Sequence, residues 1–107
     1  MNGEILSLVI GVIDFEKDQI KIDKPKMYHV VLLNDDYTPA EFVVYILTEV
    51  FALELQKATQ VMFATYRNRK GIVGTYLKDI AESKVAKATK YSSKHQHPLK
   101  FDIEEVE

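Results

Sequence analysis

The chain has 107 residues, of which 47% are hydrophobic and 28% charged, and its formal net charge at pH 7 is −2. A chain of this length forms one domain around one hydrophobic core, and the composition is that of an ordinary globular protein. The negative net charge argues against nucleic acid as a partner, because contacts with phosphates require a basic surface.

The absence of cysteine and the N-terminal sequence both favour a cytoplasmic location. Without cysteine the chain can form neither a disulfide nor a thiolate metal site, which fits a reducing compartment. Residues 5–13 form a β-branched apolar run that is too short to span a bilayer. The run lacks the preceding basic residues and the small-residue cleavage pattern of a signal peptide. We therefore expect no contact with a membrane.

Residues 1–26 are expected to form an extension and linker in front of a core domain at residues 27–107. The β-branched content of residues 5–13 favours a short strand, whereas residues 14–26 are dense in Asp and Lys and contain Pro25, as linkers do. Exposed β-branched segments pair readily with strand edges. The apolar run is therefore a candidate either to pack on the domain or to mediate self-association.

The core domain is expected to begin with a strand that leads into a helix through a polar turn. Residues 27–33 form a nearly continuous apolar run, which predicts a strand buried on much of both faces. After the turn, Thr38 is the predicted N-cap of a helix, with Pro39 at the first helical position and Glu41 completing a capping box.

The turn itself contains Asn34, Asp35 and Asp36 and allows two interpretations. In the first, it is a strand-to-helix connection whose acids favour the positive end of the helix dipole. In the second, it is a cation site. An amide oxygen and two carboxylates on one rigid loop could hold an ammonium group, while an adjacent apolar pocket holds its side chain.

Periodicity predicts the remaining elements. Apolar residues recur at intervals of three and four in helices over residues 39–52, 53–67 and 77–93. Residues 71–76 have strand composition, and residues 99–104 alternate apolar with charged side chains as a half-buried strand does. The order predicts a small α+β domain, βααβαβ, with a three-stranded antiparallel sheet and three helices packed on one face.

Two details of the middle of the chain follow from the same patterns. In the second helix, Leu55, Ala58, Met62 and either Thr65 or Tyr66 lie along one side at steps of three and four residues, which predicts a common face. The basic run at residues 67–70 is interpreted as a solvated surface loop and not as a nucleic-acid contact, because no aromatic residues are interleaved with it.

The sequence provides no constellation typical of an enzyme. We find no nucleophile with a base, no pair of opposed carboxylates and no phosphate-binding glycine-rich loop, so we expect neither catalysis nor a cofactor. Asp35 and Asp36 are adjacent, so their side chains diverge in extended backbone. His95 and His97 are interpreted as solvated, because the cysteine or acidic ligands of known metal sites do not accompany them.

The run from Met27 to Pro39, followed by residues 41–43, resembles the ClpS family. These are bacterial adaptors that bring proteins with destabilising N-terminal residues to an AAA+ protease. The similarity covers roughly residues 25–104. Further matches are Ala58-Thr59-Gln60, Met62, Gly74, Ala81-Glu82, Lys84-Val85-Ala86 and His97-Pro98-Leu99. The resemblance implies the same βααβαβ arrangement.

The resemblance also implies a pocket for the first residue of another protein. Within it, Asn34 and Asp36 would contact the α-ammonium, and Asp35 and Thr38 would shape the polar rim. The apolar wall would be formed by Val43, Met62 and Leu99. A free ammonium next to a large apolar side chain would satisfy both halves of this site, whereas an acetylated or internal residue would leave the acceptors unpaired.

Three positions of this sequence depart from the family at that site. Ala40 stands where the family usually has a methionine that narrows the pocket mouth. Tyr66 stands where it usually has a histidine that hydrogen-bonds the ammonium, and Thr65 replaces an apolar residue. The missing methionine predicts a pocket that accepts bulkier or β-branched first residues. Refilling of that space by the Tyr66 ring is the alternative.

Taken together, the resemblance implies an adaptor for a Clp AAA+ unfoldase of the ClpA or ClpC type, bound through the unfoldase N-domain. Its substrates would begin with Phe, Leu, Trp or Tyr, with Ile as a further candidate. Asp79 and Lys84 stand at the positions that contact the unfoldase in the family. The alternative is a ClpS-like regulator or specialised adaptor that binds the unfoldase but has altered or lost its recognition of N-terminal residues.

Overall fold

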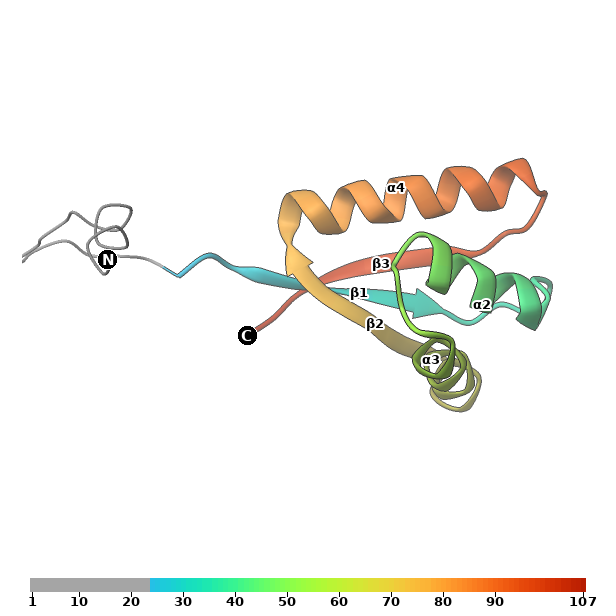
Figure 1. Ribbon diagram of the computed structural model, residues 1–107. Coiled ribbons are helices and arrows are strands. Elements are labelled where there is room, and N and C mark those ends of the chain that lie inside the picture. Colours follow the sequence, from blue (N-terminus) through green and yellow to red (C-terminus); the bar gives the residue numbers. More distant parts are fainter. Residues whose placement is uncertain (1–23) are drawn as a thin grey trace, which may run out of the picture.

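Six elements make up the part of the chain that the computed structural model describes, residues 24–107 (Figure 1). The strand expected at residues 5–13 lies outside this range. The elements are, in order, β1 (Met27–Leu33), α2 (Ala40–Glu49), α3 (Leu55–Asn68), β2 (Lys70–Leu77), α4 (Lys78–Lys94) and β3 (Lys100–Glu105). The predicted α+β class and element order are confirmed.

The three strands form an antiparallel sheet in the order β2-β1-β3. The central position of β1 explains its continuous apolar run, because this strand has a neighbour on each side. Met27 pairs with Leu77, and Leu33 pairs with Lys70. The turn into α4 therefore lies at one end of the sheet, and the loop into α2 lies at the other (Figure 1).

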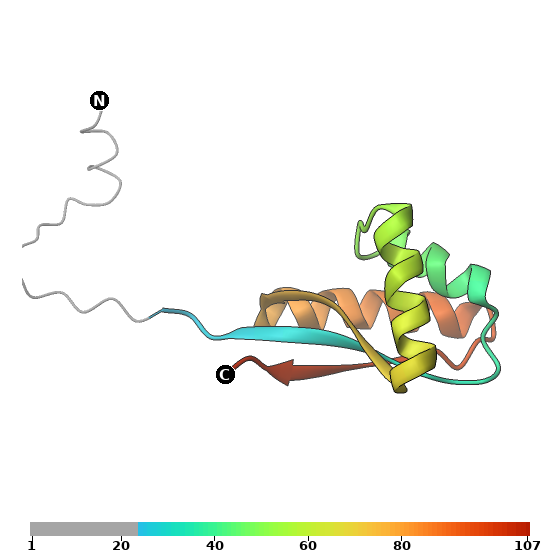
Figure 2. The same ribbon diagram turned by 90° about the horizontal axis from the view of Figure 1, so that it is seen from below.

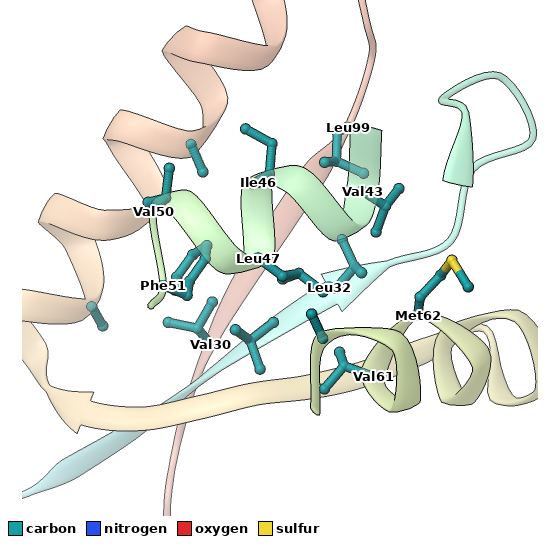
Figure 3. Packing of buried hydrophobic residues seen from close by; sticks show 14 residues of the cluster. Val30, Leu32, Val43, Ile46, Leu47, Val50, Phe51, Val61, Met62 and Leu99 are labelled. Carbon is teal, nitrogen blue, oxygen red and sulfur yellow. The ribbon is translucent and has the colours of Figure 1, made fainter. Parts of the chain in front are cut away.

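The hydrophobic core lies between the sheet and the three helices (Figure 3). Val30 and Leu32 of β1 are almost completely buried, together with Ile46 and Leu47 of α2. Figure 2 shows that α4 runs along the strands whereas α3 crosses them. Members of all three helices join one cluster with the strands, namely Val30, Leu32, Val43, Ile46, Leu47, Val50, Phe51, Ala58, Val61, Met62, Val73, Ala81, Ala88 and Leu99.

The predicted N-cap of the first helix is wrong by one residue. Pro39 occupies the N-cap position of α2, and its carbonyl accepts hydrogen bonds from the N–H groups of Phe42 at 3.0 Å and Val43 at 3.1 Å. The Thr38 hydroxyl donates instead to the Asp35 carboxylate at 2.9 Å. Because α2 starts one residue later, with Pro39 at the N-cap, no side chain caps the helix and the predicted capping box does not form.

The surface loop predicted at residues 67–70 is also wrong. Arg67 and Asn68 complete α3, and Lys70 is the first residue of β2. Arg69 alone makes the turn, in the left-handed conformation with φ 74° that ends many helices. The side chains of residues 67–70 are all exposed. The charged run therefore indicated residues in contact with solvent, and it did not indicate a segment without regular structure.

The buried side of α3 begins one turn after the start of the predicted face. Ala58 and Met62 are buried, and Val61 and Thr65 lie beside them. Leu55, however, is 67% exposed. It is the first residue of α3, and the contact of this helix with the core starts with Ala58.

Gly71→Ala is expected to lower the free energy of unfolding by about 1–3 kcal/mol, because the core would have to shift to admit a methyl group. A Cβ at this position would lie 2.5 Å from Thr65 Oγ1 and 3.1 Å from the Val61 carbonyl oxygen. Urea denaturation measures the change. In a Thr65→Ala background the same substitution should cost less, because the closest atom is gone. An equal cost in both backgrounds would show that Thr65 is not the obstacle.

Candidate functional site

A pocket opens at the end of the sheet where β1 leads into α2. Its volume is about 230 Å³, including the part that is open to solvent. Residues from the loop, α2, α3 and the segment before β3 line it, namely Leu32, Leu33, Asn34, Asp35, Thr38, Val43, Met62, Thr65, Tyr66 and Leu99. The pocket thus brings together all of the residues expected to bind the first residue of another protein except Asp36 and Ala40.

The inner part of the pocket is apolar. Val43 of α2, Met62 of α3 and Leu99 are each buried, with 4–7% of their surface exposed. Figure 3 shows Val43 and Leu99 next to each other, with Met62 extending from α3 toward the same end of α2. Leu32 and Leu33 also line this space and were not predicted as site residues. Both lie at the end of β1 just before the loop, where the apolar pattern of a strand does not distinguish pocket lining from core.

Asp35 holds the loop through its carboxylate. Oδ1 accepts hydrogen bonds from the Tyr37 N–H at 2.7 Å and the Thr38 N–H at 2.8 Å, and Oδ2 accepts one from the Thr38 hydroxyl at 2.9 Å. Short Asp side chains commonly bond the backbone two or three residues ahead. Because Thr38 is buried, these bonds also anchor the start of α2. Asp35 is therefore committed to the structure of the loop.

Asn34 and Asp36 flank this carboxylate, and their side chains form no bonds with other residues of the described range. The Asn34 backbone N–H donates to the Arg69 carbonyl at 3.0 Å, which ties the loop to the end of α3. Within residues 24–107, no hydrogen bond or ion pair engages the Asn34 side chain or the Asp36 carboxylate. Asp36 is exposed beside the pocket and does not line it. Two oxygen acceptors are therefore available near an apolar cavity.

Thr65 and Tyr66 line the α3 side of the pocket. The Thr65 hydroxyl donates to the Val61 carbonyl at 2.8 Å and faces Gly71, so its donor is used inside the protein. Tyr66 is 46% exposed and stands at the edge of the pocket. The hydroxyl of Tyr66 can accept or donate a hydrogen bond, whereas that of Thr65 has no further proton to donate.

The other predicted residues lie outside the pocket. Ala40 is the first residue of α2 and packs, half-buried, against the core. Asp79 is exposed in the first turn of α4. Lys84 is half-buried, with Nζ 3.4 Å from the Val50 carbonyl oxygen and 5.7 Å from the centroid of the Tyr76 ring. Lys84 therefore links α4 to the end of α2.

Two tyrosines away from the pocket have a pKa above the ordinary value. The hydrogen bond between the Tyr45 and Tyr91 hydroxyls, at 3.1 Å, raises the pKa of Tyr45. Burial raises the pKa of Tyr76. Both shifts keep these phenols neutral at physiological pH.

The histidines make contacts that are separate from the pocket. His29 Nδ1 lies 2.9 Å from Thr75 Oγ1, and His95 Nδ1 lies 3.0 Å from the Tyr91 carbonyl oxygen. The His97 ring packs on Phe42 with 4.4 Å between centroids.

Over residues 24–107, no helix combines the length and apolar content required to cross a membrane.

Comparison with known proteins gives consistent matches over most of the chain. A family model for the ATP-dependent Clp protease adaptor protein ClpS matches residues 23–102. The chain is 50% identical over 91 residues to the ATP-dependent Clp protease adapter protein ClpS of Vibrio atlanticus (strain LGP32). The aligned region covers 85% of this chain and 86% of that protein. The chain is 48% identical over 84 residues to the protein of the same name from Xylella fastidiosa (strain M12), covering 78% and 79%.

The fold is similar to that of a solved relative with a ligand. The structure of Agrobacterium tumefaciens ClpS2 bound to L-phenylalaninamide matches with a TM-score of 0.75 and 40% sequence identity. The match covers 78% of this chain and 100% of that chain.

Asp35→Ala is expected to lower the free energy of unfolding by about 1–2 kcal/mol, because two backbone N–H groups and one hydroxyl lose their acceptor. Amide exchange at Tyr37 and Thr38 should become faster. Asp36→Ala is the matched control, and its free energy of unfolding should stay within about 0.5 kcal/mol of the wild type. Similar losses in the two variants would contradict the different structural roles of the two acids.

Proposed function

This chain belongs to the ClpS family of adaptors of the ATP-dependent Clp protease, and from that premise we propose that it binds the free first residue of substrate proteins and delivers them to a Clp unfoldase. One observation carries the proposal. The pocket combines a buried apolar interior with free oxygen acceptors at its edge. A protein N-terminus with a large side chain has the complementary combination of a cation and an apolar group.

The ammonium is held by Asn34 and Asp36 in this proposal. Asp35 already accepts three hydrogen bonds, so the negative charge of Asp36 is the one available to a ligand. Asp36 stays hydrated while the pocket is empty, because it is exposed. Binding replaces this water by a charge-assisted hydrogen bond, and such bonds are stronger than neutral ones. The Tyr66 hydroxyl is a further acceptor at the edge.

The side chain of the first residue enters between Val43, Met62 and Leu99. Removing its apolar surface from water supplies the non-directional part of the affinity. The ligand of the Agrobacterium relative supports this arrangement by its chemistry. L-phenylalaninamide has a free α-ammonium and a benzyl group, which are the two features that the pocket would hold here. First residues of the Phe, Leu, Trp or Tyr type have the large apolar side chain that this arrangement requires.

Acetylation of the N-terminus removes both the charge and the free ammonium donors. The ligand would then cover Asn34 and Asp36 without giving them equivalent hydrogen bonds, and unpaired acceptors in a covered site are costly. An internal residue of a chain also lacks a free α-ammonium group. The pocket would thus select the free end of a chain.

The surface for the unfoldase is proposed to be on α4. Asp79 is exposed there, and the Lys84 ammonium is oriented by Val50 and Tyr76. Both residues belong to an element that does not line the pocket. The adaptor could therefore hold a substrate and an unfoldase N-domain at the same time. No catalytic step is part of this function.

Calorimetric titration with a peptide that begins with Phe tests the proposal. The free peptide should bind, and the same peptide with an acetylated N-terminus should not. If neither binds while a Clp unfoldase N-domain does, the regulator without recognition of N-terminal residues becomes the better description.

Asp36→Ala is expected to weaken binding of the free peptide by about 1.5–3 kcal/mol, or about 10-fold to 150-fold, because the ammonium loses its anionic acceptor. Calorimetry measures the effect. Asp102→Ala serves as the control, since Asp102 is an exposed acid on β3 that does not line the pocket. Unchanged affinity in the Asp36 variant would remove this residue from the site.

Ala40→Met is expected to reduce affinity for peptides beginning with Trp or Ile by about tenfold relative to Phe and Leu, because a longer side chain narrows the mouth of the pocket. The measurement compares four peptides, beginning with Phe, Leu, Trp and Ile, on the wild type, Ala40→Met and Tyr66→His. An unchanged ranking in Ala40→Met would show that position 40 is not a gatekeeper, in line with its place outside the pocket lining.

A further inference from the structure

One side of α3 has an unusual number of exposed apolar residues. Leu55 is 67% exposed, Phe63 49% and Tyr66 46%. Figure 1 shows α3 at the periphery of the molecule, viewed nearly along its axis. These side chains therefore contribute little to the core, although they are among the large hydrophobic residues of the chain.

The three exposed residues form a row together with the half-buried Thr59. Leu55, Thr59 and Phe63 follow one another at intervals of four, and Tyr66 lies three residues after Phe63, so they share one side of the helix. The Thr59 hydroxyl donates to the Leu55 carbonyl at 2.9 Å, so its hydrogen is used within the helix. We call these four residues the α3 row.

The α3 row is continuous with the pocket. Tyr66 belongs to the row and also lines the pocket, and Met62, the neighbour of Phe63, lines it as well. Residues three apart in a helix are separated by about 4.5 Å along the axis, and an extended chain advances about 3.3 Å per residue. The second and third residues of a chain whose first residue fills the pocket can therefore reach Phe63.

We infer that the α3 row receives the second and third residues of a bound chain and favours apolar side chains there. This inference rests on the proposed function, since the bound chain must first place its N-terminus in the pocket. The four side chains of the α3 row are uncharged, which agrees with an apolar occupant. The helix contains no Asp or Glu, so the row offers no second cation site. Its contribution is the burial of apolar surface on both partners.

The experiment uses two peptides that begin with Phe and end in the same polar tail, one with Leu and one with Ser at positions two and three. The wild-type protein should bind the Leu peptide about fivefold more tightly, as expected for partial burial of two side chains. In Phe63→Ser this preference should fall toward one, while affinity for the Ser peptide stays at the wild-type value. Leu55 lies eight residues, or about 12 Å, farther along α3, beyond the reach of the third peptide residue, so Leu55→Ser should keep the preference. Both substituted residues are exposed, so the fold should remain intact.

Ile80→Ser is the matched control. Ile80 is 45% exposed and also lies on a helix, but α4 does not line the pocket. The control should keep the fivefold preference. If Ile80→Ser reduces the preference as much as Phe63→Ser does, the effect is not local and the inference is overturned.

The remaining outcomes separate this inference from the proposed function. If both peptides bind equally to the wild type, or the preference survives in Phe63→Ser, the inference falls and the proposed function stands. If neither peptide binds, both fall. Sedimentation of the same proteins tests the competing occupant, a second copy of the chain. A dimer that Phe63→Ser dissociates, with the peptide preference unchanged, would assign the row to self-association instead.

Discussion

The three hydrogen bonds accepted by the Asp35 carboxylate are the interaction on which the candidate site depends. They fix the path of the chain between β1 and α2 without a disulfide or a glycine in the loop. They also determine what the two neighbouring residues can do. With Asp35 turned into the loop, the side chains of Asn34 and Asp36 have no bonding partner among residues 24–107. Of these two adjacent aspartates, Asp35 therefore stabilises the loop, and Asp36 is exposed to solvent.

The wall of the pocket on α3 depends on a second local constraint. Gly71 has no side chain, which allows Thr65 to approach β2 closely. The Thr65 hydroxyl bonds to its own helix, so the close contact leaves no buried donor unpaired. This contact holds α3 against the sheet and thereby places Met62 and Tyr66 at the pocket. The departure from an apolar residue at position 65 therefore adds no free donor to the site.

Much of the fold could be predicted because the sequence patterns are local. The apolar run of β1 and the alternation at Leu99–Glu104 correspond directly to the central and outer strands. The predictions failed where a tertiary contact competed with a local preference. Thr38 fits the N-cap pattern, but its N–H and hydroxyl both donate to the Asp35 carboxylate, which holds Thr38 in the loop, and the helix starts one residue later. Leu55 fits the periodicity of a buried face, yet periodicity does not show where a helix stops touching its neighbours.

The site was predicted less completely than the fold. The resemblance identified the residues that the pocket brings together, but their roles in binding remain predictions. Leu32 and Leu33 were missed because a strand residue next to a loop has no pattern that separates pocket lining from core. Ala40 was assigned to the mouth from a family position alone. Its place in the packing of α2 became visible only with the neighbouring side chains.

The register of β1 has a consequence for how a substrate would travel. The start of α4, where Asp79 lies, is at the Met27 end of this strand, and the pocket is at the Leu33 end. Six steps of about 3.3 Å separate these ends, so the strand works as a spacer of roughly 20 Å. If the unfoldase binds at Asp79 as proposed, its contact with the adaptor lies about 20 Å from the first residue of a substrate held in the pocket. A bound substrate would then need at least about six extended residues to reach from the pocket to that contact.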